Sequence, residues 1–370
     1  NIFKEIPHIA LWLKLFALML FFSIIGTING YHIYGIVDPI KTIGGFFYLG
    51  IGMTAFILTL YYGQNFRFRN AVYISFLSPL LFAPFIFMPD RAEKWGFIIE
   101  RIYFYGLHKN PTTFAFLTSM ACIILIGGYF STKQKNQKVL YWLGIVFLLS
   151  LCLWTGSRAA WLALFLSFTW MAIYKNRIGR LLVLFGAAAI TLTISFAIIP
   201  HQAKIMALDR IYPRISENFP DYTRFSAISL KTTITSIQGS YPSLPYQSRQ
   251  SIWPQSIALF IKNPMGLGVE YFRSAQAIYQ NSSSTHSHNT ALQIGLTGGI
   301  GLVIICLFFL SAVLQKMSRS EKDAEWLTLG GMLVGSFVFL MIGEYFYIIP
   351  WVWIIAALAC AKTDDTTSLQ

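Results

Sequence analysis

Charged side chains are scarce in this chain. Only 12% of its 370 residues are Asp, Glu, Lys or Arg, whereas 55% are apolar. So few polar side chains cannot cover the surface of a soluble globule of this length. Runs of about 20 apolar residues, the length that crosses about 30 Å of hydrocarbon, recur along the chain. They lack the alternation of a barrel strand, so the sequence predicts an all-α polytopic membrane protein.

Cysteine and clustered acidic residues are also rare. The four cysteines all lie within apolar runs, and none has the spacing to His or to another Cys that a metal site requires. The only adjacent acidic pair, Asp364-Asp365, lies in the polar C-terminal tail. The first apolar run has no small-residue cleavage site, so we expect no cleavable signal peptide. The sequence therefore indicates neither a disulfide framework nor a metal centre.

Ten apolar runs are candidates for membrane spans. We predict helices over residues 9–28, 40–61, 71–88, 112–130, 139–154, 159–174, 180–199, 290–314, 326–342 and 345–361. They divide the chain into seven spans within residues 1–199, a large loop over 200–288, three spans within 289–361 and a tail over 362–370. Cations concentrate in four short loops that fall on one side if every span crosses once, and this side is predicted to be cytoplasmic.

The large loop then faces the opposite compartment. Between residues 200 and 288 it holds eight Lys and Arg against four Asp and Glu, which gives 8 − 4 = +4. An anionic ligand and attraction to lipid headgroups both explain this excess. The net charge of +13 is spread over loops on both membrane faces, so we expect no nucleic-acid partner.

Three local motifs lie on this outer face, and the first contains Arg158. Residues 155–158 read Thr-Gly-Ser-Arg and leave almost no loop between two spans. An arginine at this boundary can direct a planar cation at a phosphate close to the bilayer. A side chain that only extends to lipid headgroups is the alternative.

The second motif is a helical stretch within the large loop. Ser251 is predicted to cap a short interfacial helix, with Arg249 at or just before its N-terminus. Asn263-Pro264 and Gly266 end the pattern of apolar residues at helical spacing, which consists of Trp253, Ile257, Phe260 and Ile261. The helix dipole and the arginine together favour an anion, whereas a helix that only rests on the membrane is the alternative.

The third motif is His286-Ser287-His288-Asn289, which leads into Gln293 and glycines at 295, 298, 299 and 301. Histidine exchanges protons near neutrality, and glycines at this spacing let neighbouring helices approach closely. A histidine at the mouth of a span can also be a plain polar boundary residue. Together with the two arginine motifs, His288 becomes a candidate base.

These motifs, in this order around a large loop, resemble the bacterial O-antigen ligase and polymerase superfamily of integral-membrane glycosyltransferases. The resemblance runs from about residue 110 to the last span and includes the Asn-Pro-Met-Gly-Leu-Gly segment over 263–268. It implies glycan transfer from undecaprenyl pyrophosphate to an acceptor hydroxyl, on lipid A-core or another glycan, at the periplasmic face of the bacterial inner membrane. It also implies about twelve spans, so we expect further spans before residue 1.

The resemblance and the residue chemistry together assign the site. Arg158 and Arg249 would bind the pyrophosphate, since an anionic leaving group needs cations rather than a strong acid. A neutral His288 would take the acceptor proton, with Asn289, Gln293 and His286 in support. Because carboxylates are not clustered outside the tail, we expect a reaction without metal or other cofactor.

Ligase is the preferred function, because a single large loop that closes on His-x-His-Asn matches it. Repeat-unit polymerase and protein O-oligosaccharyltransferase share the motifs and stay open. A transporter or flippase is the alternative from a different class, and it would place charged or broken-helix residues at mid-membrane. Charged residues are scarce within the predicted spans, and Lys14 is the visible exception.

Overall fold

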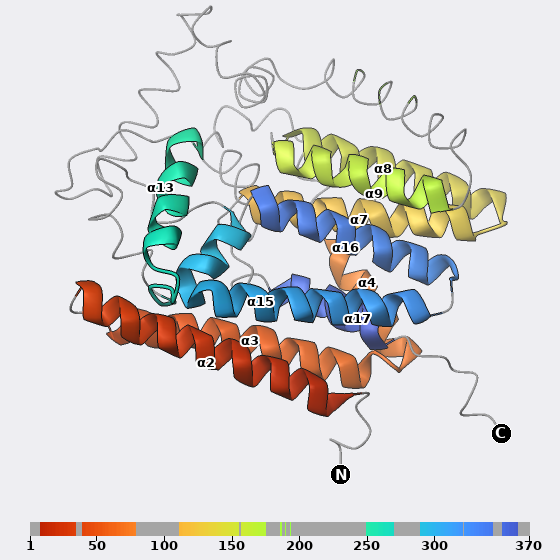
Figure 1. Ribbon diagram of the computed structural model, residues 1–370. Helices are drawn as coiled ribbons and strands as arrows, with labels where there is room; N and C mark the ends of the chain where they lie inside the picture. The colour runs from red at the N-terminus through yellow and green to blue at the C-terminus, as the bar shows by residue number, and fades with distance from the viewer. Residues whose placement is uncertain are drawn as a thin grey trace, which may run out of the picture. The chain divides into compact units, whose positions relative to one another are not determined.

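The computed structural model describes residues 8–34, 39–78, 111–154, 157–174, 249–269, 289–320, 322–342 and 350–361, with single helical positions at 186, 189 and 193. Every regular element in these ranges is a helix, and Figure 1 shows them. The ten helices are α2 (Ile9–Tyr34), α3 (Pro39–Tyr62), α4 (Phe66–Phe76), α7 (Pro111–Ser131), α8 (Lys135–Trp154), α9 (Arg158–Tyr174), α13 (Arg249–Lys262), α15 (Thr290–Arg319), α16 (Ala324–Ile342) and α17 (Pro350–Ala361).

The all-α prediction is confirmed for these residues. Five helices, namely α2, α3, α7, α15 and α16, are long and apolar enough to cross a membrane, and α9 and α17 are shorter apolar helices. Apart from three positions, the predicted span over 180–199 lies outside the described residues, as do the tail over 362–370 and all of the loop over 200–288 except 249–269. The count of ten spans and the periplasmic loop therefore stay predictions.

Several helices extend beyond their predicted ends. α2 continues to Tyr34 rather than ending at Ile28, and α15 continues to Arg319 rather than ending at Leu314. The predicted ends followed the apolar runs, whereas a helical backbone continues through polar residues that have suitable surroundings. In α15, Lys316 and Arg319 occupy the last turn, where cations interact favourably with the helix dipole.

The chain forms two compact units, which are described separately. One contains residues 1–74 and 244–370, and the other contains residues 75–243. In the first unit α2 packs along α15, and α17 packs along α3. The second unit is built around α7, which packs on α8 and α9.

An aromatic cluster holds the first unit together. It joins Trp12 and Phe16 of α2, Phe56 of α3, Phe309 of α15 and Trp353 of α17, with ring centroids 4.9 to 6.5 Å apart. All five side chains are buried. Because each ring of this kind buries about 150–250 Å², the cluster fixes four helices against one another.

Polar contacts connect α4 to the start of α16 in the same unit. Arg69 Nε lies 3.0 Å from Glu325 Oε1, and the Tyr73 hydroxyl donates to the same oxygen at 2.9 Å. Trp326 Nε1 donates to the Met317 carbonyl at 2.7 Å, so the last turn of α15 is tied to the start of α16. These contacts fix α15 at its C-terminal end.

Candidate functional site

The helix α15 is broken near its beginning, at Gly298 and Gly299. Gly298 has φ −128° and ψ 17°, and Gly299 has φ 68° and ψ −162°. The Gly299 conformation is one that essentially only glycine adopts. In a continuous helix, the carbonyls of Leu296 and Thr297 would accept the amides four residues later. The break frees both carbonyls for other donors.

The turn after α13 fills this break with its own backbone. Leu267 N donates to Leu296 O at 2.6 Å, Gly268 N donates to Thr297 O at 2.9 Å, and Ile300 N donates to Pro264 O at 2.9 Å. We call this pairing of residues 264–268 with residues 296–300 the junction. It satisfies polar groups that a broken helix would otherwise leave unpaired.

The junction brings α13 alongside the first turns of α15. The Phe260 ring lies against Gly295, at 3.0 Å from where a β-carbon would be. Ile252, Leu267 and Leu296 form one buried apolar cluster. In Figure 1 both α13 and the first segment of α15 run into the junction side by side. Their N-termini therefore lie at the end away from the junction.

Arg249 is the first residue of α13. The sequence predicted a cap at Ser251, but the helix begins two residues earlier, so Ser251 lies within its first turn. The helix ends at Lys262, as Asn263-Pro264 and Gly266 indicated, and Asn263 Nδ2 donates to Leu259 O at 2.9 Å. Arg249 thus stands where the helix dipole is positive and backbone N–H groups are free of intrahelical acceptors.

Asn289 is the N-cap of α15. Its Oδ1 accepts from Leu292 N at 3.1 Å, and its Nδ2 donates to Met341 O at 3.0 Å. The side chain is 8% exposed. One amide therefore caps α15 and also binds a carbonyl in the last turn of α16, which fixes Asn289, the residue that follows His288 in the sequence. His286 and His288 themselves lie outside the described residues.

Gln293 follows one turn after Asn289 and is 1% exposed. Thr297 follows one turn later, is also buried, and donates from Oγ1 to Gln293 O at 2.9 Å. A row of buried polar residues at i, i+4 and i+8 therefore runs from the N-terminus of α15 to the junction. Sequence reasoning found the first two members and missed Thr297, which the spacing of four could have revealed.

Arg158 is the first residue of α9, in the second unit. Ser157 precedes it and is the capping residue, since Ala160 N approaches Ser157 Oγ at 3.3 Å and Ser157 O at 3.1 Å. The arginine side chain is exposed. Arg249, Asn289 and Gln293 belong to the first unit, so the convergence of Arg158 with them stays a prediction.

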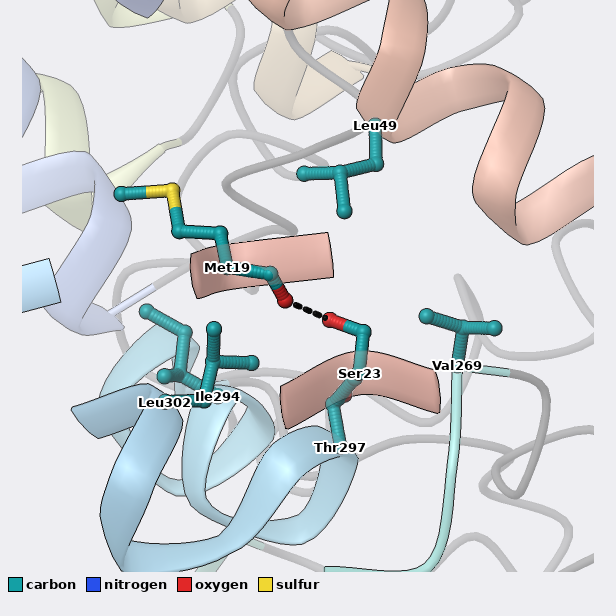
Figure 2. Close-up of a pocket in the computed structure, with 7 residues that line it drawn as sticks. All are labelled: Met19, Ser23, Leu49, Val269, Ile294, Thr297 and Leu302. Carbon is teal, nitrogen blue, oxygen red and sulfur yellow. Dashed lines mark hydrogen bonds between the residues drawn. The ribbon is translucent and has the colours of Figure 1, made fainter. Parts of the chain in front are cut away.

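A small cavity adjoins the junction (Figure 2). Its volume is about 10 Å³, which is room for about one water molecule. The hydroxyls of Ser23 and Thr297 donate to carbonyls of their own helices, so the walls are apolar. The lining residues are Met19, Ser23, Leu49, Val269, Ile294, Thr297 and Leu302. A sugar or phosphate does not fit in this cavity.

Among the described residues, no three His, Cys, Asp or Glu side chains come together as metal ligands would. All four acidic residues of the large loop lie outside those ranges. Metal independence therefore stays a prediction.

The family model described as O-antigen ligase matches residues 143–307. This match supports membership of the O-antigen ligase superfamily. The matched segment contains α9, α13, the junction and the start of α15, and with them every residue that the sequence assigned to the site. Comparisons with curated proteins and with solved structures found no match.

Membership of this superfamily supports a glycosyltransferase-like enzyme in a multi-pass membrane protein. It confirms the resemblance drawn from the three motifs. The α2 helix lies outside the matched segment, although the structure places it in contact with the junction.

Proposed function

We propose that this protein is an O-antigen ligase that transfers a glycan from undecaprenyl pyrophosphate to a hydroxyl of lipid A-core. The reaction would take place at the periplasmic face of the bacterial inner membrane, where the predicted loop over 200–288 lies. The donor and acceptor glycans are its substrates, membrane lipids surround it, and no metal or other cofactor takes part.

The observation that carries this proposal is the position of the two arginines. Arg158 begins α9 and Arg249 begins α13, and neither helix has an acidic residue in its first turn. A cation at a helix N-terminus opposes the dipole and costs about 0.3–1 kcal/mol. An anion bound there removes this conflict, because guanidinium and backbone N–H groups then act on the same charge.

In the proposed step, the acceptor oxygen attacks the anomeric carbon of the donor glycan. The bond from that carbon to the pyrophosphate oxygen breaks, and undecaprenyl pyrophosphate leaves with the electron pair. Arg158 and Arg249 stabilise the negative charge that develops on this leaving group. His288 takes the proton from the acceptor hydroxyl as the new bond forms.

Asn289 and Gln293 have supporting roles in this proposal. Asn289 fixes the start of α15 through bonds to Leu292 N and Met341 O, and His288 is the preceding residue. Gln293 continues the row of buried polar residues that begins at Asn289. His286 lies two residues further from the helix and would contact substrate rather than take the proton.

The purified protein tests the proposal directly. Undecaprenyl-pyrophosphate-linked glycan and lipid A-core should yield the joined product and free undecaprenyl pyrophosphate. Cells without the protein should accumulate long lipid-linked glycan that stays unattached. Accumulation of single repeat units would indicate a polymerase, and loss of glycan from proteins alone would indicate a protein O-oligosaccharyltransferase. Movement of lipid-linked glycan across the membrane without transfer would indicate a flippase and refute the enzyme proposal.

A further inference from the structure

The helix α2 packs against the junction. Gly26 and Gly30 are one turn apart on this helix, and neither has room for a side chain. A β-carbon on Gly26 would overlap the Thr297 carbonyl oxygen, and one on Gly30 would overlap the Leu267 carbonyl oxygen. The two glycines let the α2 backbone contact both segments of the junction, residues 264–268 and residues 296–300.

Asn29 lies between these glycines and makes a side-chain hydrogen bond to the turn. Its Nδ2 donates to Gly266 O at 2.7 Å, across 237 positions of sequence. Gly266 has φ +84°, and a β-carbon there would lie 2.5 Å from Gly299 N. The Asn29 amide therefore binds a residue of the turn that lies directly against the break of α15.

A single peptide plane transmits this contact to α15. The carbonyl of Gly266 and the N–H of Leu267 belong to the same planar trans unit, so they point in opposite directions. The carbonyl accepts from Asn29 on α2, and the N–H donates to Leu296 O on α15 at 2.6 Å. Fixing one end of the plane fixes the direction of the other.

We propose that Asn29 is a positioning residue for glycan transfer: its amide orients the Gly266–Leu267 peptide, which holds α15 in its broken form. This inference rests on the proposed function. The broken form sets the direction of the segment over 290–298, which follows the N-cap Asn289. His288 precedes Asn289 in the sequence. Asn29 thus acts on the site through one side-chain hydrogen bond to Gly266 O and one backbone hydrogen bond from Leu267 N to Leu296 O, without contact to substrate.

Three substitutions test the role. Asn29→Ala removes the donor, Asn29→Asp keeps the size of the side chain but presents an acceptor to the Gly266 carbonyl, and Asn29→Gln keeps an amide donor. We expect kcat for transfer to fall about 10- to 100-fold in the Ala and Asp variants, since a misplacement of about 1 Å can cost this much. KM for the lipid-linked donor should change less than about twofold, and Gln should restore a large part of kcat. Ile28→Ala, at a 57% exposed neighbour on the same helix, is the matched control and should leave kcat unchanged.

A second measurement does not depend on the reaction. Spin labels at Ala258 of α13 and Ala291 of α15, both exposed, report how the two helices lie against each other. The distance distribution should be narrow in the parent and in Asn29→Gln, and broad in Asn29→Ala. Parent protein without introduced cysteines, treated with the same spin-label reagent, gives the background from its four native cysteines.

The two readouts separate the possible failures. If the parent shows no transfer but the distances respond to Asn29 as expected, the proposed function is wrong and the structural link stands. If transfer is present and Asn29→Ala keeps kcat and a narrow distribution, the positioning role is refuted. A rise in KM with kcat unchanged would refute it as well, because Asn29 would then act on binding. If Ala and Asp variants both fail to accumulate, Asn29 is a folding residue and the proposal falls.

Discussion

Replacing Gly299 by alanine should open the junction. At φ 68° and ψ −162°, a residue with a side chain is strained by about 1–3 kcal/mol. The new β-carbon would also overlap the Pro264 carbonyl oxygen, so the turn must move. Moving it forfeits the hydrogen bonds donated by Leu267, Gly268 and Ile300, each worth about 0.5–1.5 kcal/mol. The strain and the lost hydrogen bonds together cost about 2 kcal/mol or more.

The matched control is Gly50→Ala in α3. No atom lies within 4 Å of a β-carbon at Gly50, so the same substitution meets open space. It should leave the protein unchanged or stabilise it by up to about 1 kcal/mol, because alanine favours the helix over glycine. The two variants differ in chemistry only by where the methyl group is placed.

Thermal unfolding of purified protein measures the effect. We expect Tm to fall by about 3 °C or more in Gly299→Ala, since about 2 kcal/mol corresponds to a few degrees in a chain of this size. Tm should stay level or rise in Gly50→Ala, and transfer should fall at least about tenfold in Gly299→Ala alone. Equal Tm and equal transfer in the two variants would refute the reasoning, because the break in α15 would then contribute neither to stability nor to activity.

The remaining predictions concern the site and the topology. Alanine at Arg158 or Arg249 should cost about 2–4 kcal/mol of transition-state stabilisation, and lysine should restore only part, since a point charge cannot reproduce a bidentate guanidinium; normal kcat/KM for Arg158→Ala would return that side chain to a headgroup contact. His288→Ala should insert normally and lose about 10²- to 10⁴-fold in transfer, with His286→Ala affected much less. Parent activity should decrease as the pH drops below about 6 to 6.5, where imidazole is protonated and can no longer accept a proton. If His288→Ala shows the same loss of activity at acidic pH, the base lies elsewhere. A cysteine at position 249 should react with a membrane-impermeant reagent from the periplasm, and labelling of Lys135→Cys from outside intact cells would overturn the assigned orientation.

The sequence predicted the class of fold and many helix positions because apolar length is a local property. It did not predict the end of α2, which we placed at Ile28, one residue before Asn29. Polarity ends an apolar run, but Asn29 is accommodated in the helix because its amide binds the Gly266 carbonyl. That partner is distant in sequence, so no window over α2 could indicate it.

The glycines of α15 show a similar limit. Their spacing suggested close helix packing, which the structure confirms in part, since Gly298 and Gly301 lie against Phe22 of α2. It did not suggest that Gly298 and Gly299 end one helical segment and begin another. Whether these glycines continue the helix or break it depends on residues 264–268, which accept and donate the hydrogen bonds at the break. Gly26 and Gly30 carried a readable signal of their own, since small residues four apart often mark close contact with a membrane helix.

The break in α15 also changes the hydrophobic length of that helix. As a continuous helix, its 30 residues would extend about 45 Å, well beyond the hydrocarbon thickness of about 30 Å. From Ile300 to Arg319 the second segment counts 319 − 300 + 1 = 20 residues, or about 30 Å, which matches the bilayer by itself. The first segment is therefore not needed to cross the membrane. Its tilt can be set by contacts within the protein rather than by the thickness of the bilayer. A change in bilayer thickness would therefore act on the segment from Ile300 to Arg319 and leave the first segment, which follows Asn289, in place.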